Sequence, residues 1–304
     1  MYMTEETPKF RHKPADIALV VLAAVAYTLC IVFNALAASP AGVSTGLYLN
    51  NTGDIADYFY LEITPAGWMF SVWGFIYTWQ YLWIIYGIAN IFRRTDDGYF
   101  YAVYPTMPPA MYAVFIVNNI ANVVWLILWD RLLSAWALPC IALVPFTLYI
   151  CLFISFRRLN DNKVTMINQG YRKDVWLTRF LTQNGMAFYA TWTTIATLLN
   201  VAIVMTYDGS VAMETSCTAV LGILAVELLF WFTLDNFVLD KFTRYLFSPF
   251  IIILLALTAS LVQGYDPTKT NKIFTMVLLG IASVMAITKV AFMIWRHRTR
   301  PLEN

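Results

Sequence analysis

The chain has 304 residues, of which 60% are hydrophobic and only 12% are charged, and its mean hydropathy is +0.63. A soluble domain would bury so much apolar surface poorly, so the composition indicates a membrane protein. The net charge of +2 comes without a basic stripe, so we expect no nucleic-acid partner.

Eight hydrophobic stretches are each long enough to cross a bilayer, whose core of about 30 Å requires about 20 apolar residues per helix. The stretches are continuous rather than alternating, which favours helices over a β-barrel. The connecting segments are too short for a soluble domain, and no internal repeat suggests an inverted-repeat transporter. We predict an all-α fold, a polytopic membrane helix bundle of about eight transmembrane helices. The predicted spans are Ile17–Ala38, Trp68–Phe92, Met111–Trp129, Ser134–Phe156, Phe180–Tyr207, Ala212–Leu234, Tyr245–Val262 and Phe274–Trp295.

Lysine and arginine residues are concentrated on one side of this predicted topology, sixteen against three. Because such residues are enriched in cytoplasmic segments, both termini are predicted to be cytoplasmic. One span more or fewer would place many of the basic residues on the opposite side of the membrane. The asymmetry therefore also supports eight spans. The cytoplasmic set is Lys9, Arg11, Lys13, Arg93, Arg94, Arg157, Arg158, Lys163, Arg172, Lys173, Arg179, Lys241, Arg244, Arg296, Arg298 and Arg300, and the opposite set is Arg131, Lys269 and Lys272.

The first span has 22 residues, more than the apolar core of a secretory signal, which has about 7–15. We therefore favour an uncleaved anchor, although cleavage after the sequence 35–37 would leave seven spans and an outside N-terminus. Asn50 begins an Asn-Asn-Thr glycosylation sequon in the first outside loop. Its position favours the secretory pathway or the plasma membrane, and the organelle stays open.

Several kinds of chemistry are missing from the predicted bundle. The only histidines, His12 and His297, lie in the two tails, so neither a histidine-activated nucleophile nor a histidine-ligated zinc can form between the helices. No phosphate-binding loop and no pair of intramembrane aspartates occurs. We therefore expect no enzyme, no catalytic residue, no metal and no cofactor. The cysteines all fall within spans and are expected to pack as small buried residues: Cys30, Cys140, Cys151 and Cys217.

Three spans carry aromatic and polar side chains at helical spacing, so that each set points to one side of its helix. Such stripes have two interpretations. Asn and Thr can hold helices together while aromatic rings fill gaps, or the stripes can line a mostly apolar ligand pocket that has few polar groups. The residues alone leave both open. The stripes are Phe70, Trp73, Tyr77 and Gln80 in the second span, Asn118, Asn122, Trp125 and Trp129 in the third, and Tyr189, Thr193, Ala196 and Asn200, flanked by Trp192, in the fifth.

These residues resemble motifs of the tryptophan-rich sensory protein / translocator protein family. The segment ITPAGWMFSVWGFIY contains Trp68 and keeps the family's W-x-x-x-Y as Trp73 and Tyr77. Asn122 and Trp125 are similar to the family's N-x-x-W. The fifth span has YATWTTIATLLN, in which Trp192, Ala196, Thr197 and Asn200 match the family's Trp followed by A-T-x-x-N.

The resemblance covers roughly residues 17–207, and it has departures. The spacing between Trp68 and Trp73 is one residue shorter than the usual spacing of the two tryptophans in the family, and Ser71-Val72 stands in place of the family's Gly-Pro-Val. The family's proposed cholesterol motif is missing from the end of the fifth span. The chain therefore resembles a long, diverged branch of the family.

The resemblance implies a five-helix translocator-like core with a pocket for a bulky hydrophobic ligand, such as a tetrapyrrole or a sterol. It divides the chain into a cytoplasmic tail (1–16), the core (17–207), three additional helices (208–295) and a second tail (296–304). Membrane lipid and a hydrophobic small molecule are the expected partners; the oligomeric state is open. The loop 39–67 would cover the pocket, with Asp54, Asp57, Tyr58, Tyr60 and Glu62 in this lid.

Two charges lie deep in the predicted additional helices, Glu227 in the sixth span and Lys289 in the eighth. Each is about 10–12 Å inside the cytoplasmic end, at about 1.5 Å per residue. Ionised residues in lipid are costly and usually pair. We predict that the sixth and eighth helices are neighbours and that Glu227 pairs with Lys289. The alternatives are a Lys289 that extends to the headgroups and a protonated Glu227.

Two other functions compete with the binding of a hydrophobic ligand. The first alternative is a secondary transporter of a small solute or ion that uses the pair of Glu227 and Lys289, and the second is a membrane enzyme.

Overall fold

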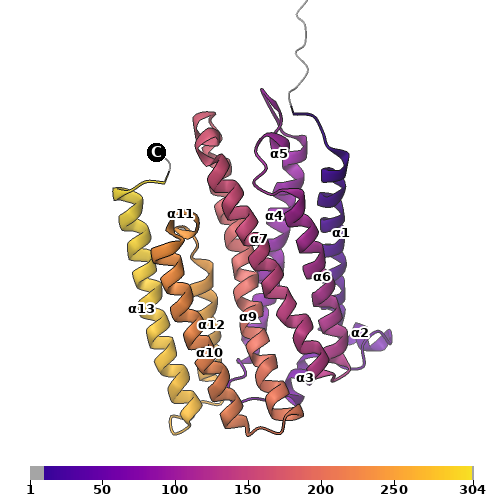
Figure 1. The fold of residues 1–304 in the computed structure, drawn as a ribbon. Coiled ribbons are helices and arrows are strands. Elements are labelled where there is room, and N and C mark those ends of the chain that lie inside the picture. Colours follow the sequence, from indigo (N-terminus) through magenta and orange to yellow (C-terminus); the bar gives the residue numbers. More distant parts are fainter. Residues whose placement is uncertain (1–9, 303–304) are drawn as a thin grey trace, which may run out of the picture.

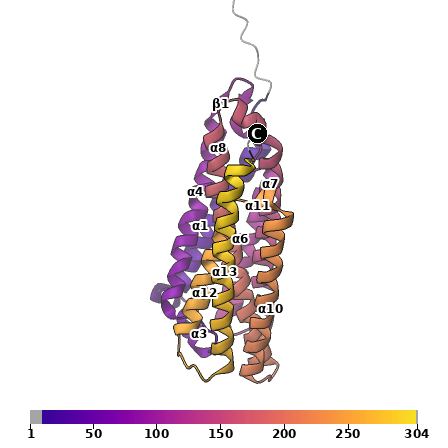
Figure 2. The same cartoon turned by 90° about the vertical axis from the view of Figure 1, so that its left-hand side faces the viewer.

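The computed structural model describes residues 10–302, and its long helices run side by side in one bundle (Figure 1). Each predicted span coincides with one helix or with two or three helical segments joined end to end. The bundle is broad in Figure 1 and narrow in Figure 2. The long helices are α1 (Pro14–Ala37), α4 (Val72–Phe92), α6 (Pro109–Asp130), α7 (Ser134–Asn168), α9 (Gly185–Ile203), α10 (Met213–Thr233), α12 (Ser248–Val262) and α13 (Thr270–Thr299).

Six helical segments of the described chain are long and apolar enough to cross a membrane. The other two predicted spans fall short for different reasons. The helix α12 has only 15 residues. The helix α4 has 21 residues, but its tryptophans, tyrosines, glutamine and asparagine lower its hydropathy. Both helices lie among the others in the bundle, and the first and last described residues lie at the same end of it, as an even number of crossings requires (Figure 1). The chain is an all-α polytopic membrane bundle.

Several helix ends follow from proline. Pro14, Pro109 and Pro249 stand in the first turn of α1, α6 and α12, where the missing N–H costs no hydrogen bond and the φ angle already suits a helix. The helix α7 instead contains Pro139 and Pro145 in its interior and still continues to Asn168, twelve residues beyond the predicted end of the fourth span.

Wider π-helical turns interrupt the fifth and sixth spans, which the sequence did not predict. They are η2 (Thr178–Asn184) and η3 (Val204–Asp208) at the two ends of α9, and η4 (Leu234–Val238) after α10. A π-helical turn changes the direction of the side chains that follow it, and such turns are frequent at functional sites. The fifth span therefore begins and ends in backbone that departs from the regular α-helix.

The packing order of the helices places α6 between α1 and α7, and α9 against α7 and α4. On its other side α9 contacts α10 and α12, and α13 packs against both of these. Figure 1 shows this order, with α1 at one edge and α13 at the other. The predicted neighbourhood of the sixth and eighth helices, α10 and α13, is confirmed.

Short elements lie at the two ends of the bundle. Near the termini are β1 (Arg94–Thr95), paired antiparallel with β2 (Gly98–Tyr99), and the helices α5 (Phe100–Val103), α8 (Arg172–Leu177) and α11 (Asp240–Thr243). At the opposite end the loop 39–67 forms α2 (Pro40–Ser44) and α3 (Thr52–Tyr58) and leads into the 3-10 helix η1 (Gly67–Ser71).

The loop 39–67 is bound both to the end of the fifth span and to the C-terminal helices. The backbone N–H of Ala66 donates to the Ala259 carbonyl of α12 at 3.1 Å. Glu62 accepts a hydrogen bond from Asn271 of α13 at 3.0 Å, and Tyr207 of η3 donates to the Tyr60 carbonyl at 2.9 Å. The loop therefore closes this end of the bundle over the core and the C-terminal helices together.

The predicted pair of Glu227 with Lys289 is wrong. Lys289 donates to Asp235 Oδ1 at 2.7 Å and to the Thr243 carbonyl at 3.1 Å, and both charged side chains are buried. Glu227 lies on an exposed face of α10. The π-helical turn η4 holds Asp235 inside the bundle, where the sequence placed the end of the span.

A second ionic cluster surrounds Asp240 of α11. Arg244 pairs with Asp240, and Arg296 of α13 donates to the same carboxylate at 2.8 Å. Arg244 also donates to the Arg300 carbonyl at 2.5 Å. The cluster therefore joins α11 to the end of α13.

Lys9, one of the predicted cytoplasmic charges, lies outside the described residues, as does part of each predicted tail.

This cluster predicts an acid-dependent loss of stability. Burial raises the pKa of Asp240, but the hydrogen bonds and charges of Arg244 and Arg296 outweigh it and hold that pKa below its ordinary value. A carboxylate with a lowered folded pKa stabilises fully above the unfolded pKa, about 3.9, and loses its contribution as the pH falls through the folded value. We expect Asp240→Asn to lower the melting temperature at pH 7 and to show a smaller further loss than the wild type below pH 4. An equal loss in both proteins would contradict this.

Candidate functional site

A chain of hydrogen bonds crosses the core and joins four helices. Tyr77 of α4 donates to Asn34 Oδ1 of α1 at 2.6 Å, and the Asn34 amide donates to Asn122 Oδ1 of α6 at 2.8 Å. The Asn122 amide in turn donates to the Tyr189 hydroxyl of α9 at 3.2 Å. Each donor in this chain has an acceptor, as buried polar groups require. The chain sets the relative positions of the helices α1, α4, α6 and α9.

Aromatic rings lie directly beside this chain. The ring of Trp73 stacks on Tyr77 at 5.2 Å between centroids and meets Tyr189 edge-on at 6.0 Å. Trp192 contacts Trp73 at 5.9 Å and Phe70 at 6.4 Å, both edge-on. These are the offset and edge-to-face geometries that aromatic pairs prefer. We call Trp73, Tyr77, Asn122, Tyr189 and Trp192 the aromatic cluster.

A second group continues from the aromatic cluster towards the loop 39–67. Trp125 of α6 donates to Asn200 Oδ1 of α9 at 3.4 Å, and Asn200 donates to the Ala196 carbonyl one turn earlier at 2.8 Å. Trp129 stacks on Trp125 at 5.8 Å, and Phe59 of the loop covers Trp129 at 5.2 Å. The loop therefore lies over the row of rings, as the predicted lid requires.

Two indole N–H groups in this region have no hydrogen-bond partner. The Nε1 atoms of Trp192 and Trp129 are buried and unsatisfied. Leaving a buried donor unpaired costs about 1–3 kcal/mol, so such groups are uncommon.

Two predicted site residues lie outside both the aromatic cluster and the second group. Asn118 donates to the Val144 carbonyl and to Thr147 Oγ1 of α7, both at 2.8 Å, so it holds α6 to α7. Trp68 lies in η1 and is 49% exposed. The assignment of these two residues to the ligand site stays a prediction.

Sequence reasoning missed the contribution of the first helix. Asn34 occupies the middle of the hydrogen-bond chain, and Cys30, one turn earlier, donates to Asn122 Oδ1 at 3.3 Å. The available signal was that Asn34 is the one amide side chain in an otherwise apolar span. A single polar residue forms no stripe, so periodicity could not assign it a partner.

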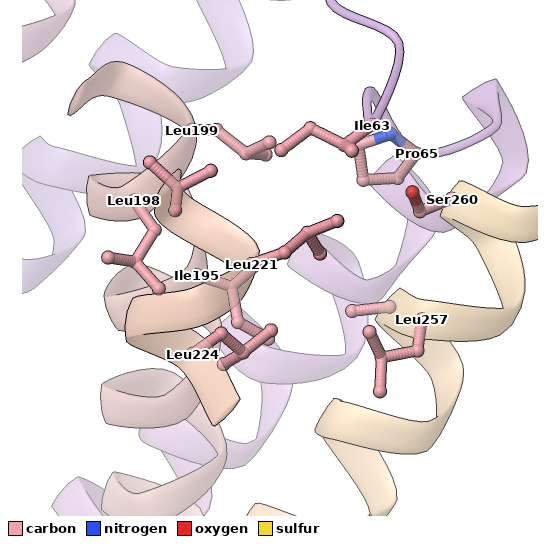
Figure 3. A pocket seen from close by; sticks show the side chains of 11 residues that line it. Ile63, Pro65, Ile195, Leu198, Leu199, Leu221, Leu224, Leu257 and Ser260 are labelled. Carbon is pink, nitrogen blue, oxygen red and sulfur yellow. The ribbon is translucent and has the colours of Figure 1, made fainter. Parts of the chain in front are cut away.

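One cavity lies beside this site, between α9, α10, α12 and the loop 39–67. Its volume is about 40 Å³, enough for roughly a water molecule and too small for a bulky ligand. Figure 3 shows its lining of aliphatic side chains, with the Ser260 hydroxyl at one side. No residue of the aromatic cluster lines it. A bulky ligand in the cluster would therefore require the rings to move apart.

Comparison with known proteins gives one match. A family model described as TSPO-like protein matches residues 20–239, whereas no curated protein and no solved structure matches the chain. The match extends beyond the five spans on which the motifs lie and includes α10 and η4. It confirms the resemblance seen in the motifs and covers well over half of the sequence. The chain therefore belongs to the TSPO-like protein family.

Proposed function

We propose that this integral membrane protein binds or carries a bulky hydrophobic ligand, of tetrapyrrole or sterol type, at the aromatic cluster. The observation that carries the proposal is the unpaired, buried Nε1 of Trp192. It sits among rings that offer flat apolar surface, next to a hydrogen-bonded chain that offers fixed polar groups. Ligand sites have this composition, mostly aromatic with a few oriented polar atoms. The role is binding and not catalysis.

The substitution Trp192→Phe tests the proposal, because it removes the unpaired N–H and retains an aromatic ring. With protoporphyrin IX as probe and quenching of tryptophan fluorescence as readout, we expect about fivefold to tenfold weaker binding, the worth of one lost hydrogen bond. Trp231→Phe is the matched control, since its Nε1 is also buried and unpaired but belongs to α10. Equal affinities for the wild type and Trp192→Phe, or an equal loss in the control, would remove Trp192 from the site.

The transporter alternative depended on a pair between Glu227 and Lys289. Lys289 is instead bound to Asp235 and to a backbone carbonyl, within a cluster that joins the end of α10 to α13. That arrangement is typical of a structural contact between helices. We therefore favour ligand binding over ion-coupled transport, and a membrane enzyme is the least supported of the three.

We further propose that both termini are cytoplasmic and that the loop 39–67 faces a lumen or the exterior. The distribution of basic residues supports this orientation. The side chain of Asn50 is exposed, so it is accessible for glycosylation at that face. Its neighbour Asn51 caps α3 through the Gly53 N–H at 2.9 Å. The division of the bundle into a five-helix core and three additional helices is part of the same proposal.

A further inference from the structure

A larger cavity lies at the opposite end of the bundle from the loop 39–67. Its volume is about 290 Å³, close to the lower limit of about 300 Å³ for small-molecule sites. It is enclosed by the starts of α1 and α6, the end of α4, the segment 101–109 that contains part of α5, and Arg158 of α7. It shares no residue with the aromatic cluster or with the smaller cavity.

The charges of the lining favour an anion. Lys13 and Arg158 come from different helices and are both exposed at the rim, whereas Asp16, which is half-buried, is the one acidic residue of the lining. Asp16 reduces the positive potential but does not cancel it. Both cations therefore line the same cavity.

Two helix N-termini reinforce the same preference. Lys13 is the N-cap of α1 and Pro108 is the N-cap of α6, and both residues line the cavity. The N–H groups of Asp16 and Met111 in the two first turns donate to the Lys13 and Pro108 carbonyls at 3.0 and 2.9 Å. The N-terminus of a helix carries a partial positive charge that favours a nearby anion. Proline in the first turn removes one N–H group from each helix, and Asp16 in the first turn of α1 reduces the effect there, so α6 contributes more than α1. The two helices have 24 and 22 residues, long enough for this effect.

The rest of the lining fits the uncharged part of such a ligand. Tyr112 and the prolines of the segment 101–109 give an apolar wall, and Asn90 and Thr106 are buried polar groups within it. Tyr101 accepts a hydrogen bond from the Lys13 backbone N–H at 2.8 Å, which holds the start of α1 against the segment. The cavity is therefore a formed site and not a gap between loose elements.

We propose that this cavity binds a phosphate-bearing group, held by Lys13, Arg158 and the N-termini of α1 and α6. The phosphate belongs either to an anionic lipid of the adjacent leaflet or to a soluble phosphate ester. The two sources share the same chemistry. The proposal does not depend on a ligand in the aromatic cluster.

Two probes distinguish the sources. Dioctanoyl phosphatidic acid carries acyl chains and glycerol 3-phosphate carries the same headgroup without them, and each is titrated onto the full chain in uncharged detergent by thermophoresis. We expect saturable binding that Arg158→Gln weakens about tenfold and Lys13→Gln weakens to a similar extent. Ala102→Trp, which fills the cavity, is expected to abolish binding.

Arg157→Gln is the matched control, because Arg157 is the neighbouring exposed cation of α7, contacts Phe153 and does not line the cavity. Binding of the phosphatidic acid alone assigns the site to lipid, and binding of both probes assigns it to the phosphate group itself. No saturable binding of either probe overturns the proposal. So does an equal loss with Arg157→Gln and Arg158→Gln, since general surface charge would then explain the affinity.

Discussion

Lys289→Met is expected to be the most destabilising single substitution among those that touch no ring of the aromatic cluster. It removes the cation that pairs with Asp235, whose Oδ2 has no hydrogen-bond partner among the described residues. Removing one member of a buried ion pair costs about 3–5 kcal/mol, because the remaining charge has no compensation. Thermal unfolding in detergent, followed by tryptophan fluorescence, measures the loss.

The partner substitution has a smaller expected effect. In Asp235→Asn, the Lys289 ammonium keeps its hydrogen bond to the Thr243 carbonyl at 3.1 Å. The double variant Asp235→Asn/Lys289→Met should recover part of the loss, since no buried charge is then left alone. Strictly additive losses would mean that the two side chains do not interact.

Glu227→Gln separates this pairing from the one that the sequence suggested. Glu227 is exposed on α10, so Glu227→Gln breaks no buried ion pair, and we expect a much smaller loss of stability than for Lys289→Met. A loss as large as that of Lys289→Met would instead support a pair between Glu227 and Lys289 and would contradict the structure.

The aromatic cluster could be predicted because residues three or four positions apart point to the same side of a helix. Trp73 and Tyr77, and likewise Tyr189 and Trp192, are spaced in this way, so their directions followed from the sequence. Periodicity does not predict which neighbouring helix faces a given turn of the helix. Asn118 shares the stripe of Asn122 but lies one turn away, where α7 crosses the same side of α6.

The partner of Lys289 could not be predicted for a related reason. Depth in the membrane follows from the regular rise of an α-helix, and the predicted sixth span ends at Leu234, which places Asp235 just outside it. The π-helical turn η4 continues that span and holds Asp235 inside the bundle. No residue pattern in 234–238 distinguishes such a turn from an ordinary helix end.

The second large effect is expected at Gly185, where α9 packs against Trp79 of α4. A Cβ added there would lie 2.4 Å from Cδ1 of Trp79, which is too close for any real contact. The backbone of Gly185 is ordinary α-helix, with φ −60°, so the glycine is required by the close approach and not by its conformational freedom. Gly185→Ala must therefore displace the indole of Trp79.

That displacement would break the contacts that join the two helices. The Trp79 indole donates to the Phe180 and Leu181 carbonyls of η2 at 3.2 and 3.1 Å, and Gln80 donates to the Gly185 carbonyl at 2.8 Å. Overpacking of this kind costs about 1–3 kcal/mol. The unpaired carbonyls of η2 would add to it, so we expect a clear fall in melting temperature.

Gly222→Ala and Gly280→Ala are the matched controls, because an added Cβ meets no other atom within 4 Å at either position. Alanine is the better helix former by up to about 1 kcal/mol, so both controls should be neutral or slightly stabilising. Trp79→Leu in the Gly185→Ala background should recover part of the loss, since the smaller side chain no longer collides with the new methyl group. If Gly185→Ala melts at the same temperature as the two controls, α4 and α9 do not approach as closely as the structure places them.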